Sequence, residues 1–269
     1  MKSRFFLLLL LSVISYTTVQ ARELMVIKSG HLGCDDSIRV YSPGDQHNTK
    51  NIPTLFLLHG WSGNYRNWGD KYDLQALCDK TGFRIITPDG FYNSWYLDNT
   101  DPGQMQWRTF FHSELFPFIQ RKYGLDPKTT FITGLSMGGH GAINLFIDNP
   151  GNFRAAGSMS GVLDLELTNL KNTELIKVVG DKPERISGES AVNRVEKLYG
   201  LDKPVIVTCG HDDVYSKCTE VFSARCREKG IPHVLILSPG KHSWQYWGYA
   251  LEEHVNFFQR LLDHKNMGY

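Results

Sequence analysis

From residue 54 onward, short apolar runs alternate regularly with longer segments of helical periodicity. Each run is apolar at consecutive positions, which is typical of parallel strands that are covered on both faces. The intervening helical segments are the crossovers that such strands need. Strands are expected at Thr54–Leu58, Arg84–Thr87, Thr129–Thr133, Ala155–Met159, Val205–Cys209 and His233–Leu237, and helices at about 66–79, 105–123, 137–148, 216–229 and 244–263.

Two stretches lie outside this alternation. Glu23–Lys28 and Ser37–Ser42 alternate apolar and polar residues, which predicts an antiparallel pair. Residues 162–203 form a long connection with helical pieces around 172–180 and 189–199, either a cap over the carboxyl ends of the strands or an excursion at the sheet edge. The predicted fold is α/β, in one domain over residues 22–269, with a mostly parallel central sheet, helices on both faces and an antiparallel N-terminal edge.

The first 21 residues are typical of a signal peptide. Lys2 and Arg4 precede the apolar run Phe5–Ile14, and Val19-Gln20-Ala21 forms a small-residue cleavage site. The apolar run is about half of the roughly 20 residues that a membrane span requires. We therefore expect a secreted or periplasmic protein with no membrane span after signal removal.

Charge and cysteine content exclude other classes. Lys and Arg number 29 against 28 for Asp and Glu, so the chain lacks the basic surplus that nucleic-acid binding needs. Five cysteines do not make a disulfide framework, and the odd number leaves at least one unpaired. Cys218 and Cys226 would lie about 12 Å apart on one helix, beyond bridging distance. Whether Cys34 and Cys78 form a disulfide stays open.

The segment Gly134-Leu135-Ser136-Met137-Gly138 has the pattern of a nucleophile elbow. A predicted strand precedes it and a predicted helix follows it, which is the context that the sharp turn of a G-x-S-x-G motif requires. Glycines on both sides of Ser136 leave room for the neighbouring strand and helix. Ser136 is thus the expected nucleophile.

A serine nucleophile needs a base and an orienting acid, which should follow at later strand ends in the order Ser, acid, His. His242 is the preferred base because it lies in a glycine-bearing loop between the last predicted strand and the closing helix. Asp213 is favoured over Asp212 as the acid, since it lies three residues beyond the glycine that ends the preceding strand. His140 and His211 are weaker candidates for a catalytic role, and solvated positions are expected for His31, His47, His112, His254 and His264.

The loop His59-Gly60-Trp61-Ser62-Gly63 follows the first predicted parallel strand, where an oxyanion hole takes its second donor. The backbone amides of Trp61 and Met137 are the expected donors, and His59 is expected to be structural. A metal site from His211 and its neighbouring aspartates is disfavoured because no second ligand cluster exists. No metal or cofactor is therefore expected.

These motifs resemble the esterase D-like branch of the α/β-hydrolases, which includes feruloyl and acetyl xylan esterases, tributyrin esterases, S-formylglutathione hydrolases and mycolyltransferases. The resemblance covers about residues 35–263 and rests on four segments: Leu57–Asn64, Pro88–Tyr96, Gly134–Gly141 and His242–Trp247. It implies the triad Ser136, Asp213 and His242, with oxyanion amides from Trp61 and Met137.

Export favours a carbohydrate esterase over the glutathione-linked enzyme of the family. Aromatic residues that follow the motifs suit phenolic acyl groups or sugar rings, and Trp95, Tyr96 and Trp244 are expected to bind substrate. The expected function is a secreted serine esterase on feruloyl or acetyl esters of plant polysaccharide. A general short-chain carboxylesterase and an acyltransferase remain as alternatives, and so does core packing for each aromatic residue.

Overall fold

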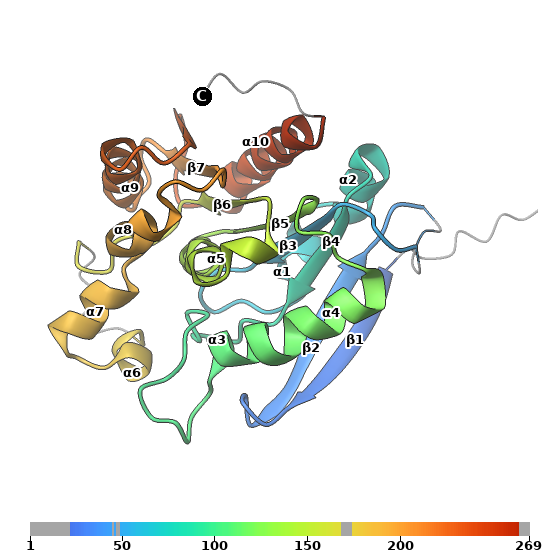
Figure 1. Cartoon of the computed structure of the whole chain (residues 1–269), viewed down its shortest axis with the longest axis horizontal. Helices are drawn as coiled ribbons and strands as arrows, with labels where there is room; N and C mark the ends of the chain where they lie inside the picture. The colour runs from blue at the N-terminus through green and yellow to red at the C-terminus, as the bar shows by residue number, and fades with distance from the viewer. Residues whose placement is uncertain (1–21, 45, 47–48, 168–173, 264–269) are drawn as a thin grey trace, which may run out of the picture.

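The computed structural model describes residues 22–44, 46, 49–167 and 174–263, and the predicted signal peptide lies outside them. A single eight-stranded sheet, in the order β1-β2-β4-β3-β5-β6-β7-β8, runs through the molecule (Figure 1). The strands are β1 (Arg22–Ser29), β2 (Cys34–Tyr41), β3 (Thr54–Leu58), β4 (Arg84–Pro88), β5 (Thr130–Gly134), β6 (Ala155–Met159), β7 (Val205–Gly210) and β8 (His233–Ser238).

Strand direction divides the sheet as predicted. β1 pairs with β2 and β2 with β4 in antiparallel fashion, whereas all pairs from β4 to β8 are parallel. The parallel strands therefore end at one common edge, where the loops that follow them meet. All the predicted parallel strands are present, each within a residue of its expected bounds.

Ten α-helices are assigned among the described residues. They are α1 (Asn67–Lys71), α2 (Leu74–Thr81), α3 (Trp107–Phe110), α4 (Phe116–Tyr123), α5 (Met137–Asp148), α6 (Ile176–Val179), α7 (Pro183–Glu189), α8 (Ala191–Arg194), α9 (Ser216–Glu228) and α10 (Trp244–Leu262). Helices α5, α9 and α10 match the sequence prediction closely.

Two predicted helices are interrupted, and each interruption has a local cause. Tyr72 is extended and the Asp73 side chain caps a new helix by accepting from the Ala76 amide, so the segment 66–79 forms two helices. The segment 105–123 contains a π-helical stretch before Pro117, which has no amide hydrogen to donate. In residues 162–203, α6 and α8 lie in the two predicted helical pieces, and α7, which begins at Pro183, is an additional helix mostly between them.

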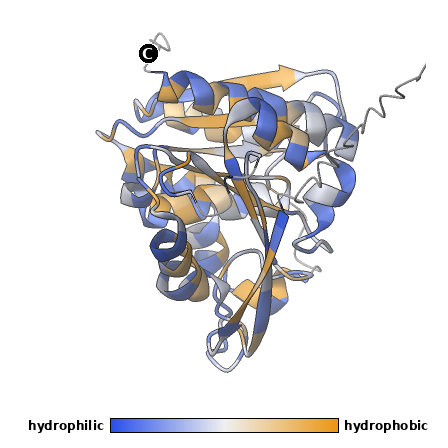
Figure 2. Ribbon diagram, turned by 90° about the vertical axis from the view of Figure 1, so that its right-hand side faces the viewer, coloured by the Kyte–Doolittle hydropathy of each residue, from blue (hydrophilic) through white to orange (hydrophobic). Residues whose placement is uncertain are grey.

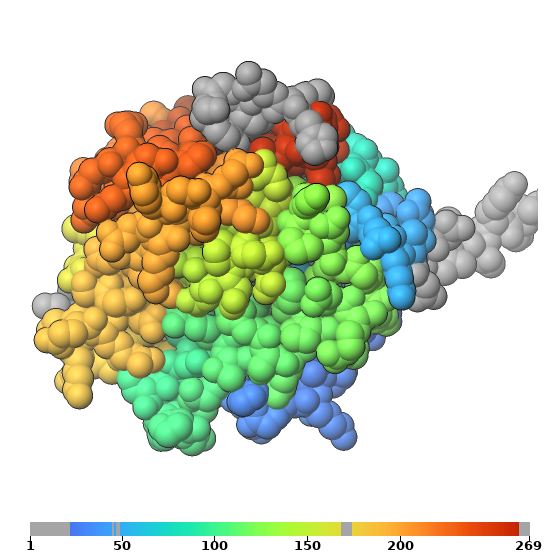
Figure 3. Space-filling model, in the orientation of Figure 1, coloured from blue at the N-terminus to red at the C-terminus, as the bar shows by residue number. Residues whose placement is uncertain are grey.

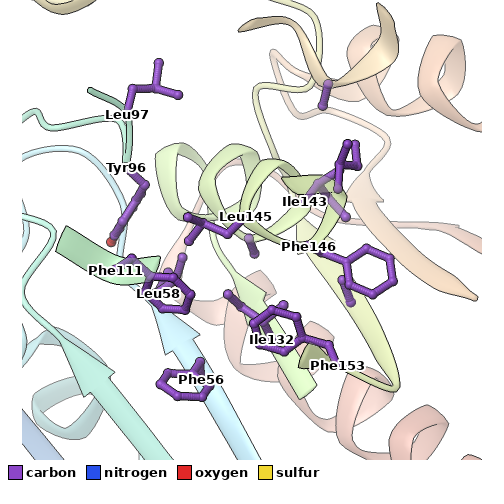
Figure 4. Packing of buried hydrophobic residues seen from close by; sticks show 14 of the residues in the cluster. Phe56, Leu58, Tyr96, Leu97, Phe111, Ile132, Ile143, Leu145, Phe146 and Phe153 are labelled. Atoms are coloured by element: carbon purple, nitrogen blue, oxygen red, sulfur yellow. The ribbon is translucent and has the colours of Figure 1, made fainter. Parts of the chain in front are cut away.

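The two faces of the sheet have separate cores, because alternate residues of each strand point to opposite faces. Phe56 and Ile132 pack with α3, α4, α5 and α8, whereas Leu55 and Phe131 pack with α2 and α10. Apolar residues accordingly gather along the central strands (Figure 2) and between the sheet and α5 (Figure 4). The prediction of helices on both faces is confirmed.

Helices α7 and α8 are held against the scaffold by partly buried ion pairs. Arg108 of α3 contacts Glu189 of α7 at 2.5 Å, and Arg194 of α8 contacts Asp148 at the end of α5. Figure 3 shows this segment lying beside α5 on the same face of the molecule. These pairs join α7 and α8 to α3 and α5.

Candidate active site

Ser136 lies between β5 and α5 in a strained conformation. Its φ of 52° and ψ of −117° are rare for a residue other than glycine, and its amide donates to the Met159 carbonyl at 2.9 Å. The turn brings α5 close to β3, because a Cβ on Gly138 would lie 2.5 Å from the His59 carbonyl oxygen. The predicted elbow geometry is therefore present.

His242 and Asp213 meet Ser136 in a continuous chain of hydrogen-bonded side chains. The distance from His242 Nε2 to Ser136 Oγ is 3.0 Å, and His242 Nδ1 lies 3.0 and 3.1 Å from the two Asp213 carboxylate oxygens. An ionised Asp213 fixes the tautomer with the proton on Nδ1, which leaves Nε2 free to accept the serine proton. The arrangement can thus activate the Ser136 hydroxyl.

The environment keeps Asp213 ionised. Burial raises the pKa of Asp213, but hydrogen bonds from the His242 ring and the Tyr215 amide outweigh it and lower the pKa below the ordinary value. The side chain of Asp212 is exposed, and its backbone amide donates to Gly240. Of the two aspartates, the structure brings Asp213 to the imidazole.

Of the two expected oxyanion donors, Trp61 lines the cleft, and Met137 directly follows Ser136, which also lines it. Within the part of the chain that the structure describes, the amides of Trp61 and Met137 have no protein acceptor. His59 Nε2 accepts from the Gly90 amide at 2.7 Å, and its Nδ1 lies 2.7 Å from the Gly60 carbonyl oxygen, so it carries the proton there. His59 is therefore structural, as expected.

A cavity of about 1260 Å³ opens over Ser136 and His242. Trp95 and Trp244 line it, which agrees with their expected position, and so do Val162 and Glu174 from the long connection. Tyr96 does not: it is completely buried in the core (Figure 4), and its hydroxyl donates to the His59 carbonyl at 2.8 Å. The expectation that Tyr96 contacts substrate is wrong because its ring packs on Trp107, at 4.6 Å between ring centroids, and against Gly141, far along the chain.

Two aromatic residues that the sequence argument did not select enclose the base. The rings of Tyr215 and Trp247 lie 5.1 and 4.9 Å from the His242 ring, both edge to face. Their positions in the sequence indicate that they lie near the site. Tyr215 follows the acid Asp213 by two residues, and Trp247 lies one helical turn beyond Trp244. Both side chains also line the cavity, so they contact His242 and form part of the cavity wall.

The other histidines have different surroundings. His140 is buried, does not line the cavity, and has its Nε2 3.0 Å from the Glu189 carbonyl oxygen; burial lowers the pKa of His140 to about 4. His211 is exposed. His254 is fully buried, so its expected solvated position is wrong.

His254 of α10 bridges two strands of the sheet. Its Nδ1 lies 2.8 Å from Thr133 Oγ1 of β5, and its Nε2 lies 3.2 Å from Thr208 Oγ1 of β7. The ring passes Gly157 of β6, whose missing side chain leaves the space. Burial lowers the pKa of His254 to about 3, so the ring is neutral.

Among the described residues, no three His, Cys, Asp or Glu side chains converge as metal ligands would. All five cysteines are unpaired. Over the same residues, no helix combines the length and the apolar character that crossing a membrane would take.

The sheet, the elbow and the cleft together define an α/β-hydrolase fold with the site of a serine hydrolase. The chain belongs to the family described as "Putative esterase", whose model matches residues 29–258. The protein is accordingly a serine esterase.

Relatives agree with this class. An acetyl esterase from Caldicellulosiruptor saccharolyticus is 25% identical over 231 residues, which cover 80% of this chain and 86% of the relative. An S-formylglutathione hydrolase from Mus musculus is 25% identical over 260 residues, or 87% and 92%. A solved structure titled ferulic acid esterase superposes with a TM-score of 0.77 at 24% identity, over 89% of this chain and 97% of that chain, and supports the fold.

Proposed function

We propose that the protein is a secreted carboxylic-ester hydrolase that acts through an acyl-enzyme on Ser136. The observation that carries this proposal is the hydrogen-bonded chain Asp213–His242–Ser136, of which His242 and Ser136 line the cavity. Such a chain couples proton transfer to nucleophilic attack. The proposed site has no metal or cofactor.

The reaction has two halves. Ser136 Oγ attacks the ester carbonyl while His242 Nε2 takes the hydroxyl proton, and the amides of Trp61 and Met137 hold the oxyanion. The bond to the alcohol then breaks, and His242 gives its proton to the departing oxygen. Water attacks the acyl-enzyme with His242 as base, and the carboxylic acid leaves with Ser136 restored.

For the substrate, we infer acetyl or feruloyl esters of plant polysaccharide. The signal-peptide pattern, the similarity to an acetyl esterase and the aromatic walls of the cavity support this inference. The alternatives are a general short-chain carboxylesterase and an acyltransferase, which would use the same triad. Hydrolysis rates on p-nitrophenyl acetate, p-nitrophenyl butyrate, methyl ferulate and acetylated xylan rank these classes.

The direct test is Ser136→Ala. We expect this variant to lose ester hydrolysis by roughly a thousandfold or more, since removal of the nucleophile disables the whole triad. The purified variant should retain the circular dichroism spectrum of the wild type and fail to react with an organophosphonate probe. Retention of more than about a tenth of the activity would overturn the assignment.

A further inference from the structure

Trp61 lines the cleft, and Tyr92 packs against Trp61 from outside the lining; we call these two half-exposed aromatic side chains the rim pair. Trp61 is 49% exposed and Tyr92 54%, and their rings meet edge to face at 5.0 Å. Trp61 follows β3 and Tyr92 follows β4, so two loops contribute to one surface. Large aromatic surface left in water next to a catalytic cleft marks a place for a ligand.

The backbone holds the rim pair in this position. Ser62, next to Trp61, has a φ of 60°, and Phe91, next to Tyr92, has a φ of 52°. The Ser62 amide donates to the Tyr92 carbonyl at 2.7 Å and joins the two loops. Left-handed residues other than glycine persist only where the surroundings impose them, so the outward position of both rings is built into the fold.

The walls of the cavity differ in exposure from floor to mouth. Leu135, Val162 and Trp95 line it with 4% or less of their surface exposed, whereas Trp61 and Val214 line it at 49% and 77%. The acyl group bonded to Ser136 is next to the buried walls. The alcohol half of a bound polymeric ester must instead extend out of the cavity into water, so it lies across the exposed mouth.

The chemistry of the mouth fits a sugar. Flat indole and phenol rings offer faces for the apolar face of a pyranose ring, and amphipathic aromatic side chains suit ligands that stay partly wet. Ser62, Asn67 and Lys71 line the same cavity and provide groups for sugar hydroxyls. A hydrocarbon chain has no groups that could form hydrogen bonds with these polar side chains.

We propose that the rim pair is a subsite that binds a sugar ring in the alcohol half of the ester. This inference rests on the proposed function, which it makes more specific. The subsite lies beside the oxyanion loop, since Trp61 supplies both the indole of the subsite and the proposed oxyanion amide. A sugar stacked there is the one directly next to the scissile bond.

The test compares two esters with the same acyl group, ethyl acetate and an acetylated xylooligosaccharide, in a pH-stat. Tyr92→Ala should lower the ratio of kcat/KM on the sugar ester to kcat/KM on ethyl acetate by roughly three- to tenfold, mainly through KM. Tyr199→Ala is the matched control, because Tyr199 is 72% exposed like Tyr92 but lies at a different hollow of the surface, beside Lys229. Its ratio should equal that of the wild type.

Other outcomes separate the two proposals. An unchanged ratio in Tyr92→Ala overturns the subsite, and so does a selective loss on emulsified tributyrin, which would assign the rim pair to lipid. In either case, hydrolysis of ethyl acetate by the wild-type enzyme leaves the hydrolase proposal intact. If the wild type hydrolyses neither ester nor p-nitrophenyl acetate, the proposed function itself fails.

Discussion

Asp212 and Asp213 are neighbours in sequence with opposite surroundings. Asp213 is 4% exposed and bonded to His242, whereas Asp212 is exposed. We predict that Asp213→Asn lowers kcat by roughly a thousandfold or more, because an amide cannot stabilise the imidazolium that forms during attack. Asp212→Asn should retain most of the activity. Steady-state kinetics on p-nitrophenyl acetate decide between them, and the reverse order would make Asp212 the acid.

Single residues were predictable where local sequence determines their position. Ser136 and His242 each follow a strand with glycine nearby, so the motif and the strand order were enough to bring them together. Tyr96 was expected to contact substrate and His254 to be solvated, and both are buried instead. Tyr96 donates to the distant His59 carbonyl, and His254 contacts the distant Thr133 and Thr208. Contacts between distant parts of a chain leave no mark in its local pattern.

At the scale of elements, α10, β5, β6 and β7 are joined through His254. A Cβ on Gly157 of β6 would lie 2.4 Å from His254 Nδ1, and this contact is far shorter than packing allows. We predict that Gly157→Ala lowers the free energy of unfolding by about 1–3 kcal/mol. Gly151→Ala is the control, since nothing lies within 4 Å of its Cβ position. Urea denaturation measures both, and equal stabilities would contradict the bridge.

Strands were predicted better than helices for a physical reason. A buried parallel strand needs a consecutive apolar run, and few other structures produce one. The helical breaks at Asp73 and Pro117 depend on one cap and one missing amide hydrogen, which periodicity does not register. The long connection was recognised by its length, although the order of its short helices was not.

For the whole molecule, acid sensitivity follows from two buried histidines. Burial lowers the pKa of His140 and His254 from 6.5 to about 4 and about 3. Between pH 6.5 and these values the unfolded chain binds protons that the folded chain does not, so stability decreases as the pH falls through this window. Each histidine contributes a slope of up to about 1.4 kcal/mol per pH unit.

We predict that His254→Gln is less stable than the wild type at pH 7.5 but loses stability less steeply between pH 6.5 and 4.5. The free energy of unfolding, measured by urea denaturation at several pH values, gives the slope for each protein. His31→Gln, at an exposed histidine, should keep the wild-type slope. Parallel curves for His254→Gln and the wild type would show that His254 titrates alike in both states.

The half-exposed rim pair also bears on how this esterase can change over evolutionary time. Substitutions at exposed positions alter the free energy of unfolding by about 0.5 kcal/mol or less, whereas the buried floor of the cleft belongs to the hydrophobic core. Natural chains lie close to the minimum stability that function requires. Substitutions at the mouth can therefore change the preferred alcohol while the chain stays folded. A change of the preferred acyl group requires substitutions in the buried floor and compensating changes in the core.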